Sequence, residues 1–162
     1  MNLCKFKNVL VLAPHTDDGE LGVGATISKL VNLGSNVHYA AFSTAVKSVP
    51  EGLPKNILEI ELFEATKTLG IKKQNVHVYN YEVREFNFSR QDILEDLINL
   101  RSWEEWDLIL MPSLRDFHQD HMTIAQEGLR AFKKTTILGY ELVWNNLDFS
   151  SACFIEVSEE EA

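Results

Sequence analysis

Short apolar runs alternate along the chain with longer segments whose apolar residues recur every three or four positions. The first run, residues 9–13, is rich in Val and Leu, which is typical of strands buried on both faces of a parallel sheet. The segment after it places apolar residues at helical spacing from Leu21 to Leu33, and Gly34 supplies a C-terminal stop. The pattern therefore predicts a strand followed by a helix.

The same unit recurs three more times. The pattern predicts further strands over residues 37–42, 76–79 and 107–111, and further helices over residues 57–69, 91–100 and 121–132. Two later runs, 136–143 and 152–157, could add strands. Strands that alternate with helices imply a parallel sheet with helices on both faces. We therefore predict a Rossmann-like three-layer α/β/α domain with a mostly parallel sheet and the strand order 3-2-1-4-5.

The chain length indicates one domain. Its 162 residues match the size of a typical domain, and no repeat or low-complexity linker divides them. We therefore expect a single domain over residues 1–162. Ser158 and Glu161 have the spacing of a helix-starting capping box, yet the sequence stops at Ala162. This predicts either an acidic tail or a C-terminal helix that the chain lacks.

Charge and hydropathy narrow the range of partners. The formal net charge is −9, and Lys and Arg do not cluster densely enough to follow a phosphate backbone, so we expect no nucleic-acid partner. The apolar run at residues 9–13 is too short for a membrane span and lacks the cleavage site of a signal peptide. We therefore expect no membrane insertion and a cytoplasmic location.

Polar loops with candidate chemistry follow two of the predicted strands. The first loop contains His15, Asp17 and Asp18, and the second contains His118, Asp120 and His121. In open parallel sheets, ligand sites form at the carboxyl ends of the strands, where the strand order reverses. With the order 3-2-1-4-5, the first and fourth strands are neighbours at that reversal. We therefore expect the two loops to face one crevice.

The residue types in these loops favour a metal site. His118 and His121 are three positions apart and share one face of an incipient helix, whose dipole favours a neutral, metal-ligating ring at His121. Cys4 and Cys153 have no ligand-like spacing, so His and carboxylate side chains must supply the ligands. Two His and one carboxylate leave a coordination position open, as in catalytic zinc sites. Asp17 lies beside a candidate ligand and could act as a base.

Each loop alone also has an ordinary explanation. A single His or an Asp pair in a loop is usually a helix cap, a turn residue or a solvated charge. The functional interpretation rests on three of the five histidines falling in these two loops. The other two, His38 and His77, occupy predicted strands, and we expect them to be packed or surface residues outside the site.

At these residues the sequence resembles the zinc-dependent N-acetylglucosaminyl deacetylases of the PIG-L, or LmbE-like, family. The segment Ala13-Pro-His-Thr-Asp-Asp-Gly-Glu-Leu-Gly22 is similar to the family's A-P-H-P-D-D-E-E-L-G, and His118-Gln-Asp-His121 is similar to its H-x-D-H. The resemblance covers most of the chain, including residues 61–70 and 139–144. Thr16 replaces the usual proline, Gly19 replaces the usual glutamate, and Leu58 stands where relatives often carry an arginine.

The resemblance implies a role for each residue of the two loops. One Zn²⁺ per chain, or Fe²⁺ or another divalent metal, would be held by His15, Asp18 and His121. Asp17 would be the general base. His118 would stabilise the oxyanion and help the amine to leave, provided that neighbouring carboxylates keep its ring protonated. Asp120 would be the carboxylate that orients a histidine.

The implied reaction is hydrolysis of the N-acetyl group of an N-acetylglucosamine-type derivative, with zinc-bound water as the nucleophile. The partner would be a small amino-sugar conjugate, Arg84 is a candidate substrate contact, and relatives suggest a homo-oligomer, a trimer or a hexamer. Two alternatives stay open. One is metal-assisted hydrolysis of another bond, such as a phosphoester. The other is a non-catalytic sugar- or nucleotide-binding domain of the same fold.

Overall fold

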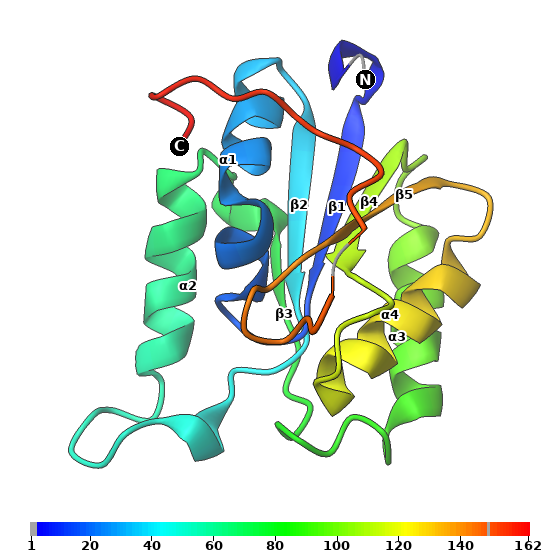
Figure 1. Ribbon diagram of the computed structural model, residues 1–162. Helices are drawn as coiled ribbons and strands as arrows, with labels where there is room; N and C mark the ends of the chain where they lie inside the picture. The colour runs from blue at the N-terminus through cyan, green and yellow to red at the C-terminus, as the bar shows by residue number, and fades with distance from the viewer. Residues whose placement is uncertain (1–2, 149) are drawn as a thin grey trace.

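The computed structural model describes residues 3–148 and 150–162 and contains a five-stranded sheet (Figure 1). The order across the sheet is β3-β2-β1-β4-β5, and every neighbouring pair is parallel. The strands are β1 (Asn8–Ala13), β2 (Asn36–Ala41), β3 (Val76–Val78), β4 (Leu108–Pro112) and β5 (Thr136–Tyr140). The predicted strand order and the parallel arrangement are confirmed.

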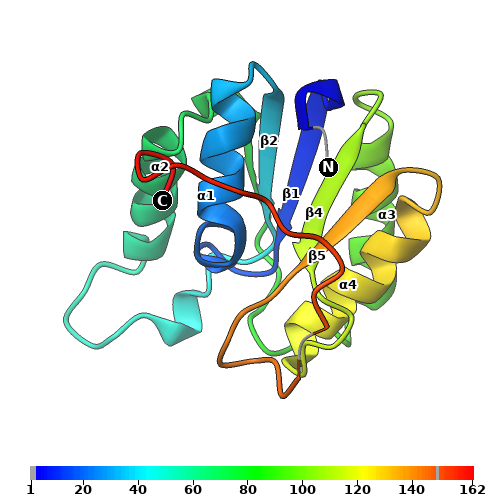
Figure 2. The same ribbon diagram turned by 45° about the horizontal axis from the view of Figure 1, so that its top comes forward.

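Helices cover both faces of the sheet, so the predicted three layers are present. The helices are α1 (Asp18–Asn32), α2 (Ile57–Thr68), α3 (Arg90–Arg101) and α4 (Gln119–Ala131). Short 3-10 turns occupy Leu3–Lys5, Val46–Ser48 and Lys73–Asn75. In Figures 1 and 2, α1 and α2 lie together on one side of the sheet, and α3 and α4 lie on the other. None of the described helices combines the length and apolar character that crossing a bilayer requires.

The central strand packs against both helix layers. In β1, Val9 and Val11 belong to the core cluster that includes residues of α1 and α2. The alternate residues Leu10 and Leu12 belong to the cluster that includes α3 and α4. All four side chains are fully buried. The two-residue period of a strand therefore anchors β1 on both faces, which gives the loop after it a rigid base.

Two helices begin earlier than the sequence predicted. Helix α1 begins at Asp18 rather than Leu21, and α4 begins at Gln119 rather than His121. The polar residues that the sequence pattern assigned to loops therefore form the first turns of helices, where polar and acidic side chains are favourable. As a result, Asp18 is held by helical backbone instead of free loop, and His121 lies in the first turn of α4 instead of at the first residue of the helix.

The run over residues 152–157, considered as a possible strand, is not a strand. It crosses the molecule as irregular chain and reaches α1 (Figure 2). Ile155 packs against the α1-side core, and the Lys29 ammonium donates to the carbonyl oxygen of Glu156 at 2.5 Å. Most of this run is exposed, so it does not form part of the packed sheet. The other run, 136–143, does contain β5, which ends at Tyr140.

His38 and His77 pack as predicted, on β2 and β3. Nδ1 of His38 lies 3.0 Å from Nε2 of His77, and burial lowers the pKa of both rings. The edge of Trp106 contacts the His38 ring, and Trp103 contacts His77. These contacts account for both histidines as structural residues of the sheet.

A buried carboxylate joins α3 to α4. Glu127 is fully buried and accepts hydrogen bonds from Nε of Arg90 and, at 2.5 Å, from Nη1 of Arg130, whereas both arginines are about half exposed. We expect Glu127→Gln to lower the free energy of unfolding by about 1–3 kcal/mol, because it weakens two charge-assisted hydrogen bonds. The loss should not be larger, since both arginines can turn toward water.

Urea denaturation measures this effect, and Glu64→Gln is the matched control. Glu64 pairs with Lys67 at 3.5 Å on the surface of α2, with both side chains more than two thirds exposed. Its substitution should change the free energy of unfolding by less than about 0.5 kcal/mol. Equal destabilisation by the two variants would contradict a special role for Glu127.

Candidate metal centre

The two polar loops begin side by side because β1 and β4 are neighbouring parallel strands. Val9 of β1 pairs with Leu108 of β4, and Val11 pairs with Leu110. Both strands therefore end at the same edge of the sheet, at the point where the strand order reverses (Figure 1). The loop that contains His15 and the loop after β4 face each other there.

Three side-chain atoms from the two loops form a tight triangle. Nδ1 of His15 lies 3.0 Å from Oδ2 of Asp18 and 3.3 Å from Nε2 of His121, and Nε2 of His121 lies 3.2 Å from Oδ2 of Asp18. Tetrahedral zinc with bonds of about 2.0–2.1 Å holds its ligand atoms about 3.3 Å apart. The triangle therefore has the size of three ligands around one such ion. Its donor set, two imidazoles and a carboxylate, is also the chemistry of catalytic zinc.

His118 offers a second possible set of ligands. One ligand atom from each of His15, His118 and His121 lies within 4.8 Å of the others. The ring centroids of His118 and His121 are 4.6 Å apart, and those of His118 and His15 are 5.2 Å apart. This second set is looser than the triangle that includes Asp18. His118 therefore lies beside the triangle, close enough to reach a group bound on it.

Two buried carboxylates orient the histidines of the triangle. Oδ2 of Asp120 lies 2.9 Å from Nε2 of His15, and Oδ2 of Asp116 lies 2.7 Å from Nδ1 of His121; both carboxylates are fully buried. When the outer ring nitrogen of a histidine donates its proton to a carboxylate, the inner nitrogen presents its lone pair. In that tautomer, each ring directs the lone pair of its inner nitrogen into the triangle, where a metal ion would replace the other proton.

Sequence reasoning missed the role of Asp116. Besides its contact with His121, Asp116 accepts a hydrogen bond from the backbone N–H of His118 through Oδ1, at 2.8 Å. The signal in the sequence was an Asp two residues before His118, the spacing at which Asp side chains accept from nearby backbone amides. One carboxylate thus organises both histidines of the second loop.

We expect Asp116→Asn to weaken zinc binding by about 10–100-fold, the usual cost of losing a carboxylate that orients a metal-ligating histidine. Competition with a chromophoric zinc chelator measures the affinity. Asp148→Asn is the control, because Asp148 is exposed and contacts Arg115 instead of a histidine. Unchanged affinity in the Asp116 variant would show that His121 does not need this carboxylate.

Asp120 is itself held by the loop between β3 and α3. The backbone N–H of Arg84 donates to its Oδ2 at 2.6 Å, and that of Phe86 donates to its Oδ1 at 3.3 Å. Arg84 adopts φ 70°, a left-handed conformation that is unusual for a residue other than glycine. The Arg84 side chain is exposed and lines a cavity of about 490 Å³ together with Gln119. Its backbone therefore supports the site directly, and its guanidinium lies beside the start of α4.

Thr16 and Gly19, the two residues at which the first loop departs from the pattern A-P-H-P-D-D-E-E-L-G, are linked through Tyr39 of β2. The hydroxyl of Tyr39 accepts from the N–H of Gly19 at 3.0 Å and donates to the carbonyl oxygen of Thr16 at 3.1 Å. A Cβ atom on Gly19 would come within 2.7 Å of the Tyr39 ring. The buried tyrosine thus occupies the space of a side chain at position 19 and fixes the loop that carries Asp18.

The carboxylates around His15 and His121 favour a cation bound in the triangle. Burial lowers the pKa of His15, but its hydrogen bonds to Asp120 and Asp18 outweigh burial and raise that pKa to about 9. Burial alone would raise the pKa of Asp18, yet the contacts with His121 and His15 hold it well below its usual range. The carboxylates therefore attract positive charge to this point, which either protons or a metal ion can supply.

His118 is fixed at the start of α4 by a backbone contact. His118 is the N-cap of α4, and its Nδ1 accepts a hydrogen bond from the backbone N–H of Asp120 at 3.2 Å. Burial, together with the nearby His121 and His15, lowers the pKa of its ring. In the neutral ring, an accepting Nδ1 leaves the proton on Nε2. This geometry favours His118 as a neutral N–H donor through Nε2.

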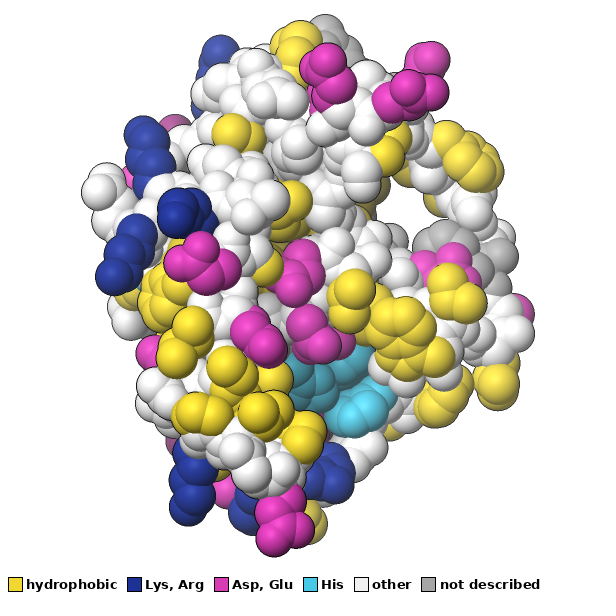
Figure 3. Space-filling model, turned by 90° about the vertical axis from the view of Figure 1, so that its left-hand side faces the viewer, with side chains coloured by type: hydrophobic (Ala, Val, Ile, Leu, Met, Phe, Trp, Pro, Cys, Tyr) yellow, Lys and Arg dark blue, Asp and Glu magenta, His cyan; other side chains and the backbone are white. Residues whose placement is uncertain are grey.

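Asp17 stands at the entrance to the triangle. It precedes Asp18 as the N-cap of α1, and its side chain remains accessible to solvent. Partial desolvation by the surrounding protein and the adjacent charge of Asp18 raise its pKa. In Figure 3 the histidines lie in a hollow with carboxylates along one side and hydrophobic side chains on both flanks. An accessible carboxylate with a raised pKa is suited to accepting a proton.

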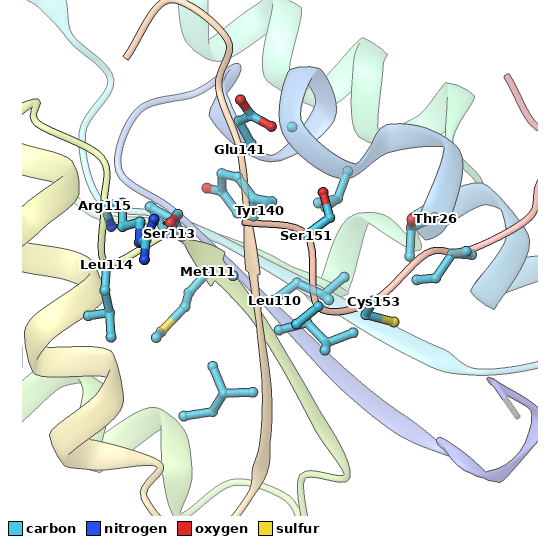
Figure 4. Close-up of a pocket in the computed structure, with 18 of the residues that line it drawn as sticks. Thr26, Leu110, Met111, Ser113, Leu114, Arg115, Tyr140, Glu141, Ser151 and Cys153 are labelled. Carbon is cyan, nitrogen blue, oxygen red and sulfur yellow. Dashed lines mark hydrogen bonds between the residues drawn. The ribbon is translucent and has the colours of Figure 1, made fainter. Parts of the chain in front are cut away.

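A larger cavity lies on the β5 side of the sheet. Its volume is about 750 Å³, and it is lined by residues of α1, β4 and β5 and by the segment 150–155 (Figure 4). Figure 4 labels several residues that line this cavity, among them Tyr140, Glu141, Ser151 and Cys153. Neither Asp18 nor any of the three site histidines lines it. The cavity is therefore separate from the triangle.

Comparisons with known proteins find a matching family and similar chains. The family model described as GlcNAc-PI de-N-acetylase, PIG-L, matches residues 10–132. A protein of Escherichia coli K12 described as the uncharacterized deacetylase YaiS is 29% identical over 96% of this chain and 85% of its own length.

Solved structures share the fold. The N,N'-diacetylchitobiose deacetylase from Pyrococcus horikoshii is 28% identical with a TM-score of 0.68, over 78% of this chain and 49% of that one. This chain thus spans about half the length of that enzyme. A deacetylase of the teicoplanin biosynthetic pathway is 16% identical with a TM-score of 0.79, over 96% of this chain and 77% of its own length, and shows a shared fold.

Proposed function

Because the chain belongs to the PIG-L family, we propose that it is a metal-dependent amidohydrolase that removes the N-acetyl group from an N-acetylglucosamine-type derivative. The products would be the free amine and acetate. The similarity to a diacetylchitobiose deacetylase supports an N-acetylated sugar as the substrate class. The observation that carries the proposal is the convergence of His15 Nδ1, Asp18 Oδ2 and His121 Nε2 within 3.3 Å of one another.

The proposed ligands are His15, Asp18 and His121, with one Zn²⁺ per chain. Fe²⁺ and other divalent ions bind the same donor atoms. Zn²⁺ as the ion bound in the cell is therefore part of the proposal. When bound, the ion supplies Lewis acidity, which acidifies a water molecule and polarises the amide carbonyl. Three protein ligands leave a coordination position open for such chemistry.

Asp17 and His118 would handle the protons and charge of the reaction. Asp17 accepts a proton from the attacking water, because its carboxylate is accessible and has a raised pKa. The Nε2–H of His118 donates toward the amide oxygen as negative charge develops there, a contribution on the order of 3 kcal/mol for one such donor. The nitrogen of the departing amine takes up the proton that Asp17 received. Asp116 and Asp120 hold the two ligand histidines in place throughout.

Two alternatives account for the site less well. A non-catalytic sugar-binding domain would not need Asp17 and His118 beside the three ligands. A two-metal phosphoesterase needs ligands for a second ion about 3.5–4 Å from the first ion, and the described residues hold one ligand cluster, built around His15 and His121. Both observations favour a single-metal hydrolase.

Acetate release tests this proposal. Protein loaded with zinc should release acetate from at least one member of a panel of N-acetylglucosamine glycosides and oligosaccharides. Chelation with EDTA should abolish the release, and added zinc should restore it. Release that survives complete removal of metal would contradict the metal-dependent mechanism. Phosphate release from sugar phosphates, without acetate from any acetylated member, would favour the phosphoester alternative.

A further inference from the structure

A turn next to the candidate metal centre presents two large apolar side chains to solvent. The backbone N–H of Asn145 donates to the carbonyl oxygen of Leu142 at 2.8 Å, which closes a four-residue turn. Val143 and Trp144 occupy its two central positions, with 78% and 61% of their surfaces exposed. Leu142 is buried and anchors the turn in the protein. The indole is therefore held outward by an anchored backbone.

The same turn is fastened to the loop that carries His121. The backbone N–H of Phe117 donates to the carbonyl oxygen of Asn145 at 3.1 Å, and Asp116 forms an antiparallel bridge with Asn146. Nδ2 of Asn145 also lies 3.4 Å from Nδ1 of His121. Trp144 is thus one residue away from a side chain that touches a proposed metal ligand. These three contacts tie the backbone of the turn to the loop that carries the site histidines.

Exposed apolar side chains also lie on the loop that carries His121 and just after the turn. Phe117, in the loop between Asp116 and His118, is 51% exposed, and Leu147, just after the turn, is 92% exposed. Figure 3 shows hydrophobic side chains directly beside the histidines, next to the carboxylates. Exposed apolar surface of this kind marks a binding site when it is rigid and adjoins a polar pocket. The surroundings of the site are therefore amphipathic.

We infer that Trp144 is a specificity-determining residue that contacts an apolar aglycone, alkyl or aryl, attached to the sugar. The inference rests on the proposed function, because it places the N-acetyl sugar at the histidines. The turn that carries Val143 and Trp144 pairs with the loop that carries His118 and His121, so an apolar group that extends from the metal centre over this loop can reach the indole. The indole offers a large flat surface at little conformational cost, and contact with an apolar group removes that surface from water. Sugars without an apolar group gain nothing from this contact.

Binding of two products that cannot be deacetylated tests the inference without relying on turnover. The probes are hexyl and methyl β-glucosaminide, titrated calorimetrically into zinc-loaded protein below the micelle concentration. We expect the hexyl compound to bind about tenfold or more tightly than the methyl compound. Trp144→Ala should remove most of that difference, a loss of about tenfold for the hexyl compound, and change methyl binding less than about twofold.

Trp103→Ala is the matched control. Trp103 is also partly exposed, at 44%, but it contacts His77 and lies just before β4 begins, at the opposite end of the strands from the site. It should leave the preference for the hexyl compound unchanged. Equal affinity of the wild-type protein for both probes, or an unchanged preference in Trp144→Ala, would overturn the inference.

A second copy of the chain is the competing occupant of this surface. Light scattering on the same two variants separates the possibilities. Dissociation of an oligomer by Trp144→Ala, with an unchanged preference for the hexyl compound, would assign the surface to self-association and overturn the inference. Tight hexyl binding without acetate release from any acetylated glycoside would retain the inference and reject the proposed deacetylase activity.

Discussion

Asp17→Asn should lower the rate of acetate release by about 10²–10⁴-fold while the protein still binds one zinc per chain. The asparagine side chain has nearly the same size and keeps the N-cap position of α1, so the backbone that carries Asp18 stays in place. The amide cannot accept a proton at neutral pH, because its oxygen is far less basic than a carboxylate. The loss should appear in kcat, since binding of the sugar does not require this proton transfer.

Metal analysis and a coupled acetate assay measure the two quantities on the same sample. Glu20→Gln is the control, because Glu20 is an acidic residue of the same helical turn that the proposed mechanism does not use. It should retain most of the activity. Wild-type turnover in Asp17→Asn would remove Asp17 from the mechanism. Loss of zinc from that variant would show instead that Asp17 helps to bind the metal.

His121→Ala should lose bound zinc and all measurable acetate release. The substitution removes one of three converging ligand atoms and leaves Asp116 buried without its ring partner. The remaining pair, His15 and Asp18, supplies too few ligands for the tetrahedral sites that zinc prefers in proteins. An unpaired buried carboxylate also costs stability, so the variant should unfold at a lower temperature than the wild type.

His38→Ala provides the comparison for this variant. It removes a half-buried histidine of β2 that contacts His77 instead of the candidate site, so it should lower stability but retain zinc. His121→Gln, which keeps more of the side-chain volume, separates loss of metal from unfolding. Full zinc occupancy in a folded His121→Gln protein would break the proposed ligand set.

The central place of β1 in the sheet was predictable from its apolar pattern. A strand buried on both faces must lie in the middle of a parallel sheet, and Val9 to Leu12 are apolar without interruption. Central placement of β1, together with right-handed crossover connections, leaves few topologies. The neighbouring position of β4, and so the meeting of the two loops, followed from the strand order.

Contacts that depend on distant segments could not be predicted in this way. Tyr39 reads as an ordinary strand residue, and only the folded structure brings its hydroxyl to Thr16 and Gly19. Asp116 looked like one more acidic loop residue, because its role depends on where the His121 ring turns. The setting of His118 was hidden for a related reason. The sequence indicates neighbouring carboxylates, but the helix N-cap geometry directs its Nδ1 to a backbone amide.

The segment 152–157 shows why the sequence pattern alone could not decide whether a run forms a strand. Its residues have strand-like composition, yet strand formation requires a partner edge in register. Here the chain crosses toward α1, where Lys29 binds the carbonyl oxygen of Glu156. Composition favours an extended conformation but does not specify its neighbour.

Anomalous diffraction from zinc-soaked crystals would locate the metal and its ligands. We expect one zinc peak per chain, about 2.0–2.2 Å from Nδ1 of His15, Oδ2 of Asp18 and Nε2 of His121, with His118 outside the coordination sphere. A peak coordinated by His118 in place of Asp18, or no peak at the triangle, would overturn the proposed ligand set.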